Sequence, residues 1–527
     1  MNTETQNKAR RLILINANVL TPDGDNSDPG WIAIKEDRIE SLGEGNGWEA
    51  FAKKDARVID CRRKAVLPGF IDPHIHLFSY AESLVSLDLR PVNNISSIAD
   101  IQTSLRNYAR HRPQGSWVRG KGYDQFSLSD KRHPDRWDLD AALSSHPVKL
   151  TYRSGHAHVL NSLALKLIGL SRSTPDPPGG MIERDLKTGE PTGLLFEMGD
   201  ILSEKIPKLS RAEIKQGIVK ANESLAKLGI TAVVEATSVN DSDRWHLLQS
   251  WKNEGILMPR IQMMLGTKAF KETGGRNFSD AGDEGSIGIG GVKIILDETT
   301  GRLHPSEREL QDLVLQIHLA GMQVSIHAIE ESAVEAACDS IAFALKHLPR
   351  EDHRHRIEHC AVCRPALAKK IASLGILVVS QPAFVFFNGE RYLKTIPEEQ
   401  LKHLYAFNTL RRAGVRIAAS SDCPIVSPDP LIGIAAAVTR KTKAGEILVP
   451  EEGIPVIEAI RLYGEYAAYA SFQENERGSL VPGKLADLVM LSDDPTQISP
   501  QKIMDLDVEM TIIGGKIVWD KHGRIYP

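Results

Sequence analysis

Eight short apolar runs, separated by longer segments, constrain the fold of this 527-residue chain more than any other feature. Short apolar runs bounded by Gly, Pro or polar residues are typical of buried strands, and segments such as 210–229 and 330–348 have the spacing of amphipathic helices. Strands and helices that alternate in this number favour an α/β fold of the (β/α)8 (TIM) barrel type over an open sheet. The predicted strands lie in residues 65–77, 147–153, 230–237, 291–297, 321–328, 355–360, 375–382 and 415–422.

The two ends of the chain differ from this middle. Residues 11–66 and the segment from 485 onward contain short β-rich runs punctuated by Gly, Pro and Asp, which indicates antiparallel sheet. Because chain termini often lie close together, we expect both ends to form one small composite β-sandwich domain. The predicted domains are the sandwich halves 1–66 and 477–527 and the barrel 67–476, with loop-rich insertions at 80–145 and about 154–210.

Composition excludes several classes of partner. The 64 Lys and Arg against 68 Asp and Glu give a net charge of −4, which argues against nucleic acid or an anionic membrane. No stretch approaches the roughly 20 apolar residues that span a bilayer, and the run 12–15 is too short for a signal peptide. Five cysteines argue against a disulfide framework and favour the cytoplasm. Cys360 and Cys363 form a lone CxxC, which we interpret as two buried thiols.

Histidine pairs of the form HxH occur three times, at 74/76, 156/158 and 353/355. With this histidine content, chance yields roughly half of one such pair, so the motif alone is weak. Only His74 and His76 end an apolar strand, where a period of two puts both imidazoles on one side. Active sites of barrels lie at the carboxyl ends of the strands. This first pair is therefore the candidate for metal binding.

Further polar residues lie in four later predicted strands, namely Lys293, His327, His359 and Asp422. A lone histidine in an apolar run is usually a core residue. Four histidines and an aspartate at strand ends are hard to explain by packing, because a barrel brings these ends together on one face. Nitrogen and oxygen donors with positions left open for water are the ligands of a metal hydrolase.

Lys293 lies in mid-strand between valine and isoleucine. A buried lysine is costly unless it is neutralised or paired. One interpretation is an ion pair with Asp297 or Glu298. The other is carbamylation by CO2, which converts the cation into a carboxylate able to bridge two metals.

Several motifs together resemble the amidohydrolase superfamily, in particular its YtcJ-like branch, which includes N-substituted formamide deformylase. The resemblance covers nearly the whole chain, and the combination is specific although no single motif is. The motifs are LPGFIDPHIHL, GYD, HPDRWDLDAA, HPV, GHAHVLNSLAL, GVKIILD, HAIEESAV, RIEH, QPAF, SDCPIVSPDPLIGIAAAVTR and GSLVPGKLADLVML.

The resemblance implies a role for each candidate ligand. His74, His76 and Asp422 match the ligands of the more buried metal, and His327 and His359 match those of a second metal. Lys293 matches the lysine that is carboxylated in binuclear relatives. Asp422 would also be the proton shuttle, taking a proton from the metal-activated hydroxide and delivering it to the leaving nitrogen. Zinc, two ions per chain, is the expected cofactor, although these ligands also admit Mn, Co or Fe.

Residue 330 departs from the branch, whose members usually read HAIGD where this chain reads HAIEE. The HxxE arrangement of His327 and Glu330 resembles mononuclear deaminases of the same superfamily, where the glutamate shuttles protons. In that case Lys293 need not be carbamylated and one metal suffices. Alternatively, Glu330 and Glu331 simply open the next helix, where acids favour the helix dipole.

Other candidates lie around this set. Asp72 would orient a ligand histidine through a hydrogen bond. Substrate contacts are expected from the segment after the second predicted strand and from matched motifs, namely His156, Arg153 and Tyr123. Arg440 also lies in a matched motif but is interpreted as a helix-surface cation. An apolar pocket lining or loop packing is the expected role of Phe384, Phe386 and Phe387.

We therefore expect a cytoplasmic, metal-dependent hydrolase that cleaves a C–N bond of a small N-substituted amide, with a small molecule as its partner. A homo-oligomer is also expected, and a homodimer is the commonest form among soluble proteins. One alternative is a mononuclear aminohydrolase of a heterocycle. Another is a catalytically inactive binding barrel, against which the intact ligand set argues. The substrate itself would be selected by loops 80–210 and 384–410, in which no pattern identifies it.

Overall fold

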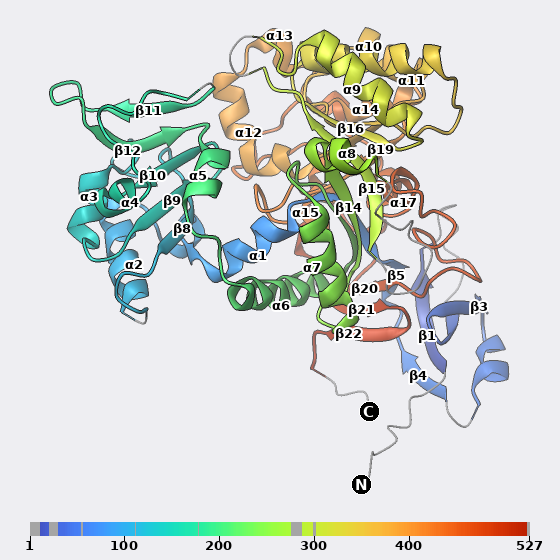
Figure 1. Cartoon of the computed structure of the whole chain (residues 1–527). Coiled ribbons are helices and arrows are strands. Elements are labelled where there is room, and N and C mark those ends of the chain that lie inside the picture. Colours follow the sequence, from blue (N-terminus) through green and yellow to red (C-terminus); the bar gives the residue numbers. More distant parts are fainter. Residues whose placement is uncertain are drawn as a thin grey trace. The chain divides into compact units, whose positions relative to one another are not determined.

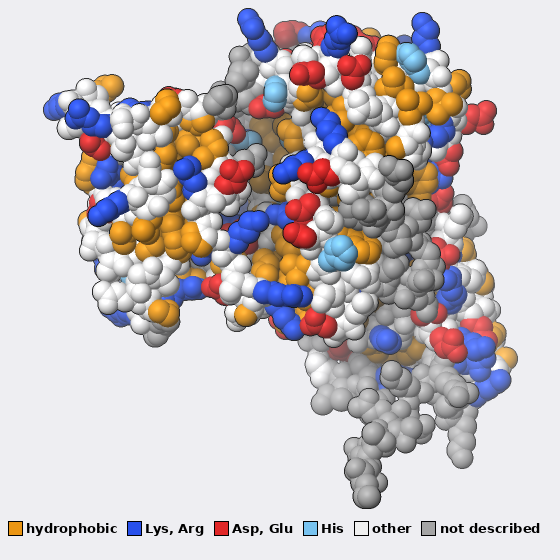
Figure 2. Space-filling view, viewed as in Figure 1, with side chains coloured by type: hydrophobic (Ala, Val, Ile, Leu, Met, Phe, Trp, Pro, Cys, Tyr) orange, Lys and Arg blue, Asp and Glu red, His pale blue; other side chains and the backbone are white. Residues whose placement is uncertain are grey.

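A computed structural model describes most of the chain and divides it into two compact units, Met1–His76 with Asn222–Pro527 and Leu77–Ala221. The described residues are 11–20, 30–53, 56–110, 112–177, 179–275, 287–298 and 302–523. The expectation about a signal peptide concerns the start of the chain, where residues 1–10 lie outside the described residues. No helix among the described residues is both long enough and apolar enough to cross a membrane. Basic and acidic side chains intermingle on the face drawn in Figure 2.

The first unit contains the predicted barrel, an eight-stranded parallel sheet (Figure 1). Its edge strands are joined by backbone hydrogen bonds from Asp422 N to His74 O (3.0 Å) and from His76 N to Cys423 O (2.9 Å). The α/β barrel class is therefore confirmed. The strands, in sheet order, are β6 (Phe70–Ile75), β13 (Ile230–Glu235), β14 (Arg260–Gly266), β15 (Gly288–Ile295), β16 (Val324–Ala328), β17 (Arg356–His359), β18 (Leu377–Ser380) and β19 (Ile417–Ala419).

The predicted second strand of the barrel is wrong. Residues 147–153 form β9 (Val148–Tyr152) of a different sheet, and β13 takes the second position in the barrel. The third strand, β14, was not predicted. The burial patterns give the physical reason, because β9 alternates between buried and half-buried residues whereas β13 is buried throughout. Alternation marks a strand with one polar face, and barrel strands are covered on both faces.

Helices cover the barrel strands, and two of them match the sequence expectation closely. Helix α6 (Arg211–Lys227), which runs from the second unit into the first, begins after Ser210, whose hydroxyl accepts a hydrogen bond from Glu213 N (3.2 Å). In the first unit, α10 spans Glu331–His347. Residues 384–410, expected as loop, instead form mainly helices. The other helices of this unit are α7 (Ser242–Asn253), α8 (Thr267–Thr273), α9 (Glu307–Leu319), α11 (Pro365–Ser373), α12 (Ala383–Thr395), α13 (Glu398–Leu401), α14 (Phe407–Arg412), α15 (Pro430–Thr439), α16 (Val456–Leu462) and α17 (Glu465–Ala470).

Strands from both chain ends meet in one eight-stranded sheet, where β5 pairs with β20. Buried side chains from both ends, including Leu14, Ile34, Leu488 and Met510, form one hydrophobic cluster. The sandwich arrangement and the domain boundaries stay predictions. The strands are β1 (Arg11–Val19), β2 (Gly30–Lys35), β3 (Arg38–Glu44), β4 (Ala56–Asp60), β5 (Ala65–Pro68), β20 (Leu488–Leu491), β21 (Val508–Ile513) and β22 (Lys516–Asp520).

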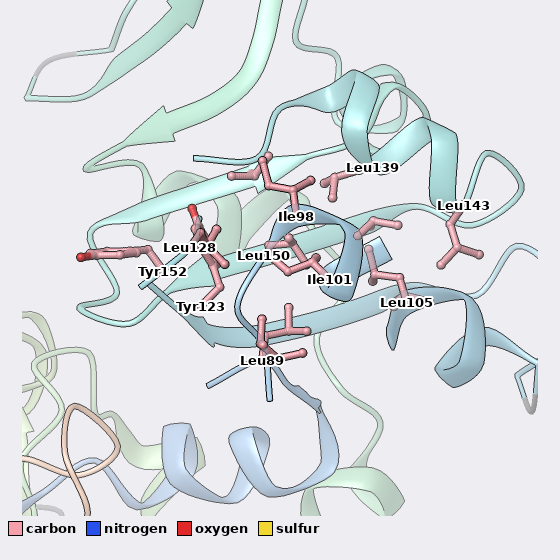
Figure 3. Close-up of a cluster of buried hydrophobic side chains, with 14 of the residues drawn as sticks. Leu89, Ile98, Ile101, Leu105, Tyr123, Leu128, Leu139, Leu143, Leu150 and Tyr152 are labelled. Atoms are coloured by element: carbon pink, nitrogen blue, oxygen red, sulfur yellow. The ribbon is translucent and has the colours of Figure 1, made fainter. Parts of the chain in front are cut away.

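The second unit corrects the expectation of loop-rich insertions, because it contains a six-stranded sheet with the order β11-β12-β10-β9-β8-β7. Its core joins apolar residues of α2 and α3 to one face of the sheet (Figure 3). The remaining elements are α1 (Leu77–Val85), β7 (Leu87–Asp88), α2 (Ile98–Ala109), β8 (Val118–Tyr123), α3 (Arg136–Ala142), β10 (Ala157–Leu160), α4 (Ser162–Leu167), β11 (Met181–Arg184), β12 (Pro191–Phe196) and α5 (Gly199–Lys205).

Candidate metal centre

All six predicted ligand residues belong to the barrel unit and lie in or just after its strands. They are His74 in β6 with His76 just after it, Lys293 in β15, His327 in β16, His359 at the end of β17 and Asp422 after β19. The carboxyl ends of parallel barrel strands lie on one face, which is the reason that residues so far apart in sequence meet.

Three of these residues form a group that can hold a metal ion. Nε2 of His76 lies 2.9 Å from Oδ1 of Asp422, and Nε2 of His74 lies 3.5 Å from the same oxygen. The ligand atoms of all three lie within 4.8 Å of one another. Oδ1 of Asp422 is buried and has no hydrogen-bond partner among the described residues. A buried, orphaned carboxylate oxygen beside two imidazole nitrogens is the donor set that a divalent metal such as zinc requires.

The ring of His74 is held from its other side by Glu358. Nδ1 of His74 lies 2.5 Å from Oε2 of Glu358, and the guanidinium of Arg356 donates hydrogen bonds to both carboxylate oxygens. Burial raises the pKa of Glu358, but Arg356 and His74 hold it well below its usual value. The carboxylate thus fixes the tautomer in which Nδ1 carries the proton and Nε2 offers a lone pair.

The electrostatics of the first group suit a metal ligand set. Burial, followed by the charge of Lys293, lowers the pKa of His74 to about 3, so this imidazole is neutral near pH 7. Burial raises the pKa of Asp422, yet the close contact with His76 and the other nearby histidines hold it well below its usual value. Neutral imidazoles and an ionised carboxylate are the forms that bind metals.

His327 and His359 form a second pair on neighbouring strands, with ring centroids 4.4 Å apart. Nδ1 of His359 donates to Oε1 of Gln381 (2.8 Å), which leaves Nε2 as the acceptor. The rings of His359 and His74 lie 5.1 Å apart, so the two groups adjoin. Burial lowers the pKa of both His327 and His359.

Lys293 contacts the first group, and its charge also acts on both histidines of the second. It is only 1% exposed, and its Nζ lies 3.2 Å from Nε2 of His74. Burial lowers the pKa of Lys293 to about 8, although Glu358 and Asp422 act in the opposite direction. Its contact is therefore with a candidate ligand, His74, while Glu298, one of its two expected ion-pair partners, accepts hydrogen bonds from Ser332.

The backbone is unusual at two of these residues. His359 and Asp422 have φ angles of 75° and 55°, in the left-handed region that residues other than glycine rarely adopt. Such strain is typical of functional sites, where surrounding contacts enforce it. Asp72 supplies such contacts, because it accepts hydrogen bonds from Ser421 and from the backbone N of His74. Asp72 was expected to orient a ligand histidine through a hydrogen bond to its ring. Its carboxylate instead accepts hydrogen bonds from backbone N–H groups and from the hydroxyl of Ser421, and Glu358 is the carboxylate that contacts the imidazole of His74.

An open cleft of about 820 Å³ adjoins His327. Glu330 lines the same cleft, and partial burial together with Glu298 raises its pKa. Most of the charged lining is acidic. The lining residues are Leu296, Asp297, Glu298, His327, Ile329, Glu330, Glu331, Ser332, Ala333, Glu335, Arg364 and Gln400.

The three predicted substrate contacts belong to the other compact unit. His156 is exposed and lies 3.0 Å from Glu197, and Nε of Arg153 lies 3.7 Å from Asp124. Tyr123 is fully buried in the core of that unit, where its hydroxyl contacts Nδ1 of His133 (2.9 Å). An enclosed ring of this kind has a packing role.

Two further expectations concern residues of the barrel unit. Arg440 is not a surface cation, because it is fully buried and its guanidinium donates to the carbonyls of Leu404, Tyr405 and Leu448. Unpaired carbonyls of a buried loop need such a donor. The aromatic residues Phe384, Phe386 and Phe387 lie on helix α12 and are half-buried.

Sequence reasoning missed the residues that hold the ligands, namely Arg356, Glu358, Gln381 and Thr237. Thr237 contacts Nδ1 of His76 (3.0 Å). A signal was present for the first two, because an arginine and a glutamate two positions apart in a four-residue strand lie on one face and are costly to bury unless they pair.

A nearly closed parallel barrel with histidine, aspartate and lysine side chains gathered at its strand ends defines the class of metal-dependent α/β-barrel hydrolases. Residues 57–519 match the Amidohydrolase family. This chain belongs to that family. The expected enzyme class, a hydrolase of carbon–nitrogen bonds other than peptide bonds, is confirmed at this level.

Individual relatives agree. The YtcJ protein of Bacillus subtilis (strain 168), whose name describes it as an amidohydrolase, is 30% identical over 506 residues, which are 90% of this chain and 92% of that protein. N-substituted formamide deformylase of Arthrobacter pascens is 30% identical over 546 residues, 98% of this chain and 99% of that enzyme. The crystal structure of an uncharacterized metal-dependent hydrolase from Pyrococcus furiosus has a TM-score of 0.73 and 25% identity and covers 92% of this chain and 100% of that one.

Proposed function

We propose that this enzyme hydrolyses the C–N bond of a small N-substituted amide at a metal centre held by His74, His76, Lys293, His327, His359 and Asp422. The observation that carries the proposal is the buried Oδ1 of Asp422, which faces two imidazole nitrogens and has no hydrogen-bond partner among the described residues. Similarity over nearly the whole chain to an N-substituted formamide deformylase supports an amide substrate.

Two zinc ions are the proposed cofactors, with Mn, Co or Fe as chemically admissible substitutes. When bound, the metal polarises the amide carbonyl and lowers the pKa of water toward neutrality. Carbamylation of Lys293 fits its burial, since its Nζ lies against the candidate ligand His74. A carbamate there would replace a buried cation by a carboxylate, which relieves the repulsion between Lys293 and the metals.

The remaining steps belong to the protein. Asp422 accepts a proton from the attacking water as the new C–O bond forms and delivers it to the nitrogen as the C–N bond breaks. Glu358, itself held by Arg356, keeps the ring of His74 in its orientation throughout. Gln381 and Thr237 do the same for His359 and His76.

A second candidate function is deamination of a heterocycle at a single metal, with Glu330 as proton shuttle. The observation in its favour is that Glu330 lines the cleft that contains His327, with a raised pKa suited to proton transfer. Glu330 also precedes helix α10 as its N-cap without a side-chain capping bond, so helix initiation does not engage its carboxylate.

The deciding experiment loads the protein with zinc and assays a panel of N-formyl and N-acyl amines, ureas, lactams and amino heterocycles. Amine release, with about two metal equivalents and a mass consistent with carbamylated Lys293, supports the amidase. One equivalent, with ammonia release that Glu330→Gln abolishes, supports the deaminase. Absence of metal binding, with Asp422→Asn indistinguishable from the wild type, refutes both and leaves a binding barrel.

The small-molecule partner follows from this function. Several expectations stay predictions. They are the cytoplasmic location, the absence of nucleic-acid and membrane partners, the possible homo-oligomer, and the substrate contacts by His156 and Arg153. Size-exclusion chromatography with light scattering tests the oligomer directly.

A further inference from the structure

One face of the six-stranded sheet in the unit Leu77–Ala221 carries a row of basic side chains. In the register of β8 and β9, Arg119 pairs with Lys149 and Lys121 with Thr151, and His158 of β10 pairs with Thr151. Because side chains alternate across a strand, and paired residues share a face, all five lie on the same face. The opposite face holds the apolar core drawn in Figure 3.

The charges on this face are poorly balanced. Glu82 of α1 accepts a hydrogen bond from the ammonium of Lys121 (2.7 Å), and Arg119 donates to the carbonyl of Pro207. In the described part of the chain, the ammonium of Lys149 has neither a hydrogen bond nor an ion pair. Burial lowers the pKa of Lys149 to about 8, and the neighbouring Lys121 and Arg119 act in the same direction against Glu82. A poorly solvated cation beside two others is costly unless an anion joins it.

His158 adds a second, independent sign of a missing partner. It is 4% exposed, and its Nε2 is buried with no hydrogen-bond partner among the described residues. Its Nδ1 lies 3.3 Å from the hydroxyl of Thr151. When that hydroxyl donates to Nδ1, Nε2 carries the ring proton and becomes an unsatisfied donor. Buried polar groups in native proteins are nearly always paired, so this atom needs an acceptor.

The position of Gly199 fits this interpretation. A Cβ at Gly199 would lie 3.5 Å from Nε2 of His158, so the glycine leaves the space beside this nitrogen unfilled. Lys149 and Lys121 are close enough for their charge to lower the pKa of His158 further, after the larger effect of burial. The unsatisfied donor and the unpaired ammonium therefore belong to one cluster.

We propose that Lys149, His158 and Lys121 form a binding site for a small oxyanion, either a carboxylate or inorganic phosphate. Lys149 supplies the uncompensated charge, Nε2 of His158 a directional donor, and Lys121, held by Glu82, a second cation. Charge-assisted hydrogen bonds to carboxylate or phosphate oxygens would satisfy both orphaned groups at once. The site does not depend on the metal centre or on the proposed reaction.

The test measures binding to the full-length protein by isothermal titration calorimetry and thermal shift, with sodium formate and sodium phosphate in separate arms and chloride at matched ionic strength. We expect saturable binding of at least one oxyanion and none of chloride. Lys149→Met and His158→Gln are each expected to weaken that binding about tenfold or more, because each removes one charged or directional contact. The control Lys166→Met, which removes an exposed lysine from the same unit, should change it less than about twofold.

The two arms identify the source of the oxyanion, since formate stands for carboxylates and phosphate for inorganic phosphate. Absence of saturable binding in both arms overturns the proposal, and so does binding that neither variant weakens. His158→Gln keeps the side chain polar and uncharged, so it provides the answer if Lys149→Met fails to fold. Because amide hydrolysis is not measured, failure here leaves the proposed function untouched.

Discussion

The barrel unit contains two clusters of histidines, at opposite ends of its strands, whose hydrogen-bond partners differ. At the carboxyl ends of the strands lie the candidate ligands His74, His76, His327 and His359. At the amino ends, Nδ1 of His318 of α9 lies 2.8 Å from Nε2 of His355, whose ring packs against that of His353. His353 and His355 precede β17. Both clusters contain an HxH pair, so the motif alone does not distinguish them.

Hydrogen bonding distinguishes them. In the amino-end cluster each of the six ring nitrogens has a partner in the protein: the His318–His355 contact, the carbonyls of Leu348 and Leu374, and the backbone N–H groups of Val324 and His355 itself. In the carboxyl-end cluster, Glu358, Thr237 and Gln381 hold the Nδ1 atoms of His74, His76 and His359. Nε2 of His76 lies 2.9 Å from Oδ1 of Asp422, and Nε2 of His74 lies 3.2 Å from Nζ of Lys293 and 3.5 Å from the same oxygen of Asp422. The amino-end cluster pairs its nitrogens with one another and with backbone groups, whereas the carboxyl-end cluster turns these Nε2 atoms toward other candidate metal ligands.

Among the variants that test this difference between the clusters, Asp422→Asn is expected to have the largest effect. The amide cannot serve as a proton shuttle and is a poor metal ligand, so kcat is expected to fall about a hundred- to ten-thousandfold. The measurement is kcat on a substrate identified in the panel above, together with the metal content. Asp505→Asn, at an exposed position, is the matched control. Retention of more than about half of the activity by Asp422→Asn would remove Asp422 from the mechanism.

The second variant, Glu358→Gln, changes the carboxylate that contacts Nδ1 of the candidate ligand His74. It weakens the hydrogen bond that orients His74 and leaves Arg356 without its anion, so zinc affinity is expected to fall about ten- to a hundredfold. Competition with a chromophoric chelator measures the affinity. Glu335→Gln, the same change at the cleft, is the control and should bind zinc like the wild type. Equal affinity in both variants would show that Glu358 does not support the metal site.

These two residues also mark how far the sequence could predict the site. Asp422 was found because it ends an apolar run, as did His74, and this rule holds wherever a strand runs into a barrel rim. Glu358 was missed because its role depends on a contact 284 positions away with His74, which no local pattern encodes. The prediction of the second barrel strand was wrong because the alternation of buried and half-buried residues in β9, which marks a strand with one polar face, was not weighed against the continuous burial of β13.

A third experiment compares the two clusters directly, through His355→Leu and His327→Leu. His355→Leu leaves Val324 N–H and the ring of His318 unpaired, so the free energy of unfolding is expected to fall by about 1–3 kcal/mol while metal content is kept. His327→Leu should instead lower the metal content, because it removes one candidate metal ligand. In the metal-free protein it should change the free energy of unfolding by less than about 1 kcal/mol. Denaturant unfolding and elemental analysis give both values. The reverse pattern would invert the assignment of the two clusters.

The smallest expected effect is a pH dependence carried by the amino-end cluster. Burial lowers the pKa of His353 and, more strongly, of His355, so the folded protein holds both neutral where the unfolded chain, with a histidine pKa of about 6.5, takes up protons. The unfolded state then binds more protons, so stability is full above about pH 6.5 and is lost as pH falls below it, by up to about 1.4 kcal/mol per pH unit for each group. Unfolding of the metal-free protein between pH 7.5 and 5 measures the slope, and His355→Leu should reduce it. The exposed His347→Leu is the control, and an equal slope in all three proteins would assign the acid sensitivity to other groups.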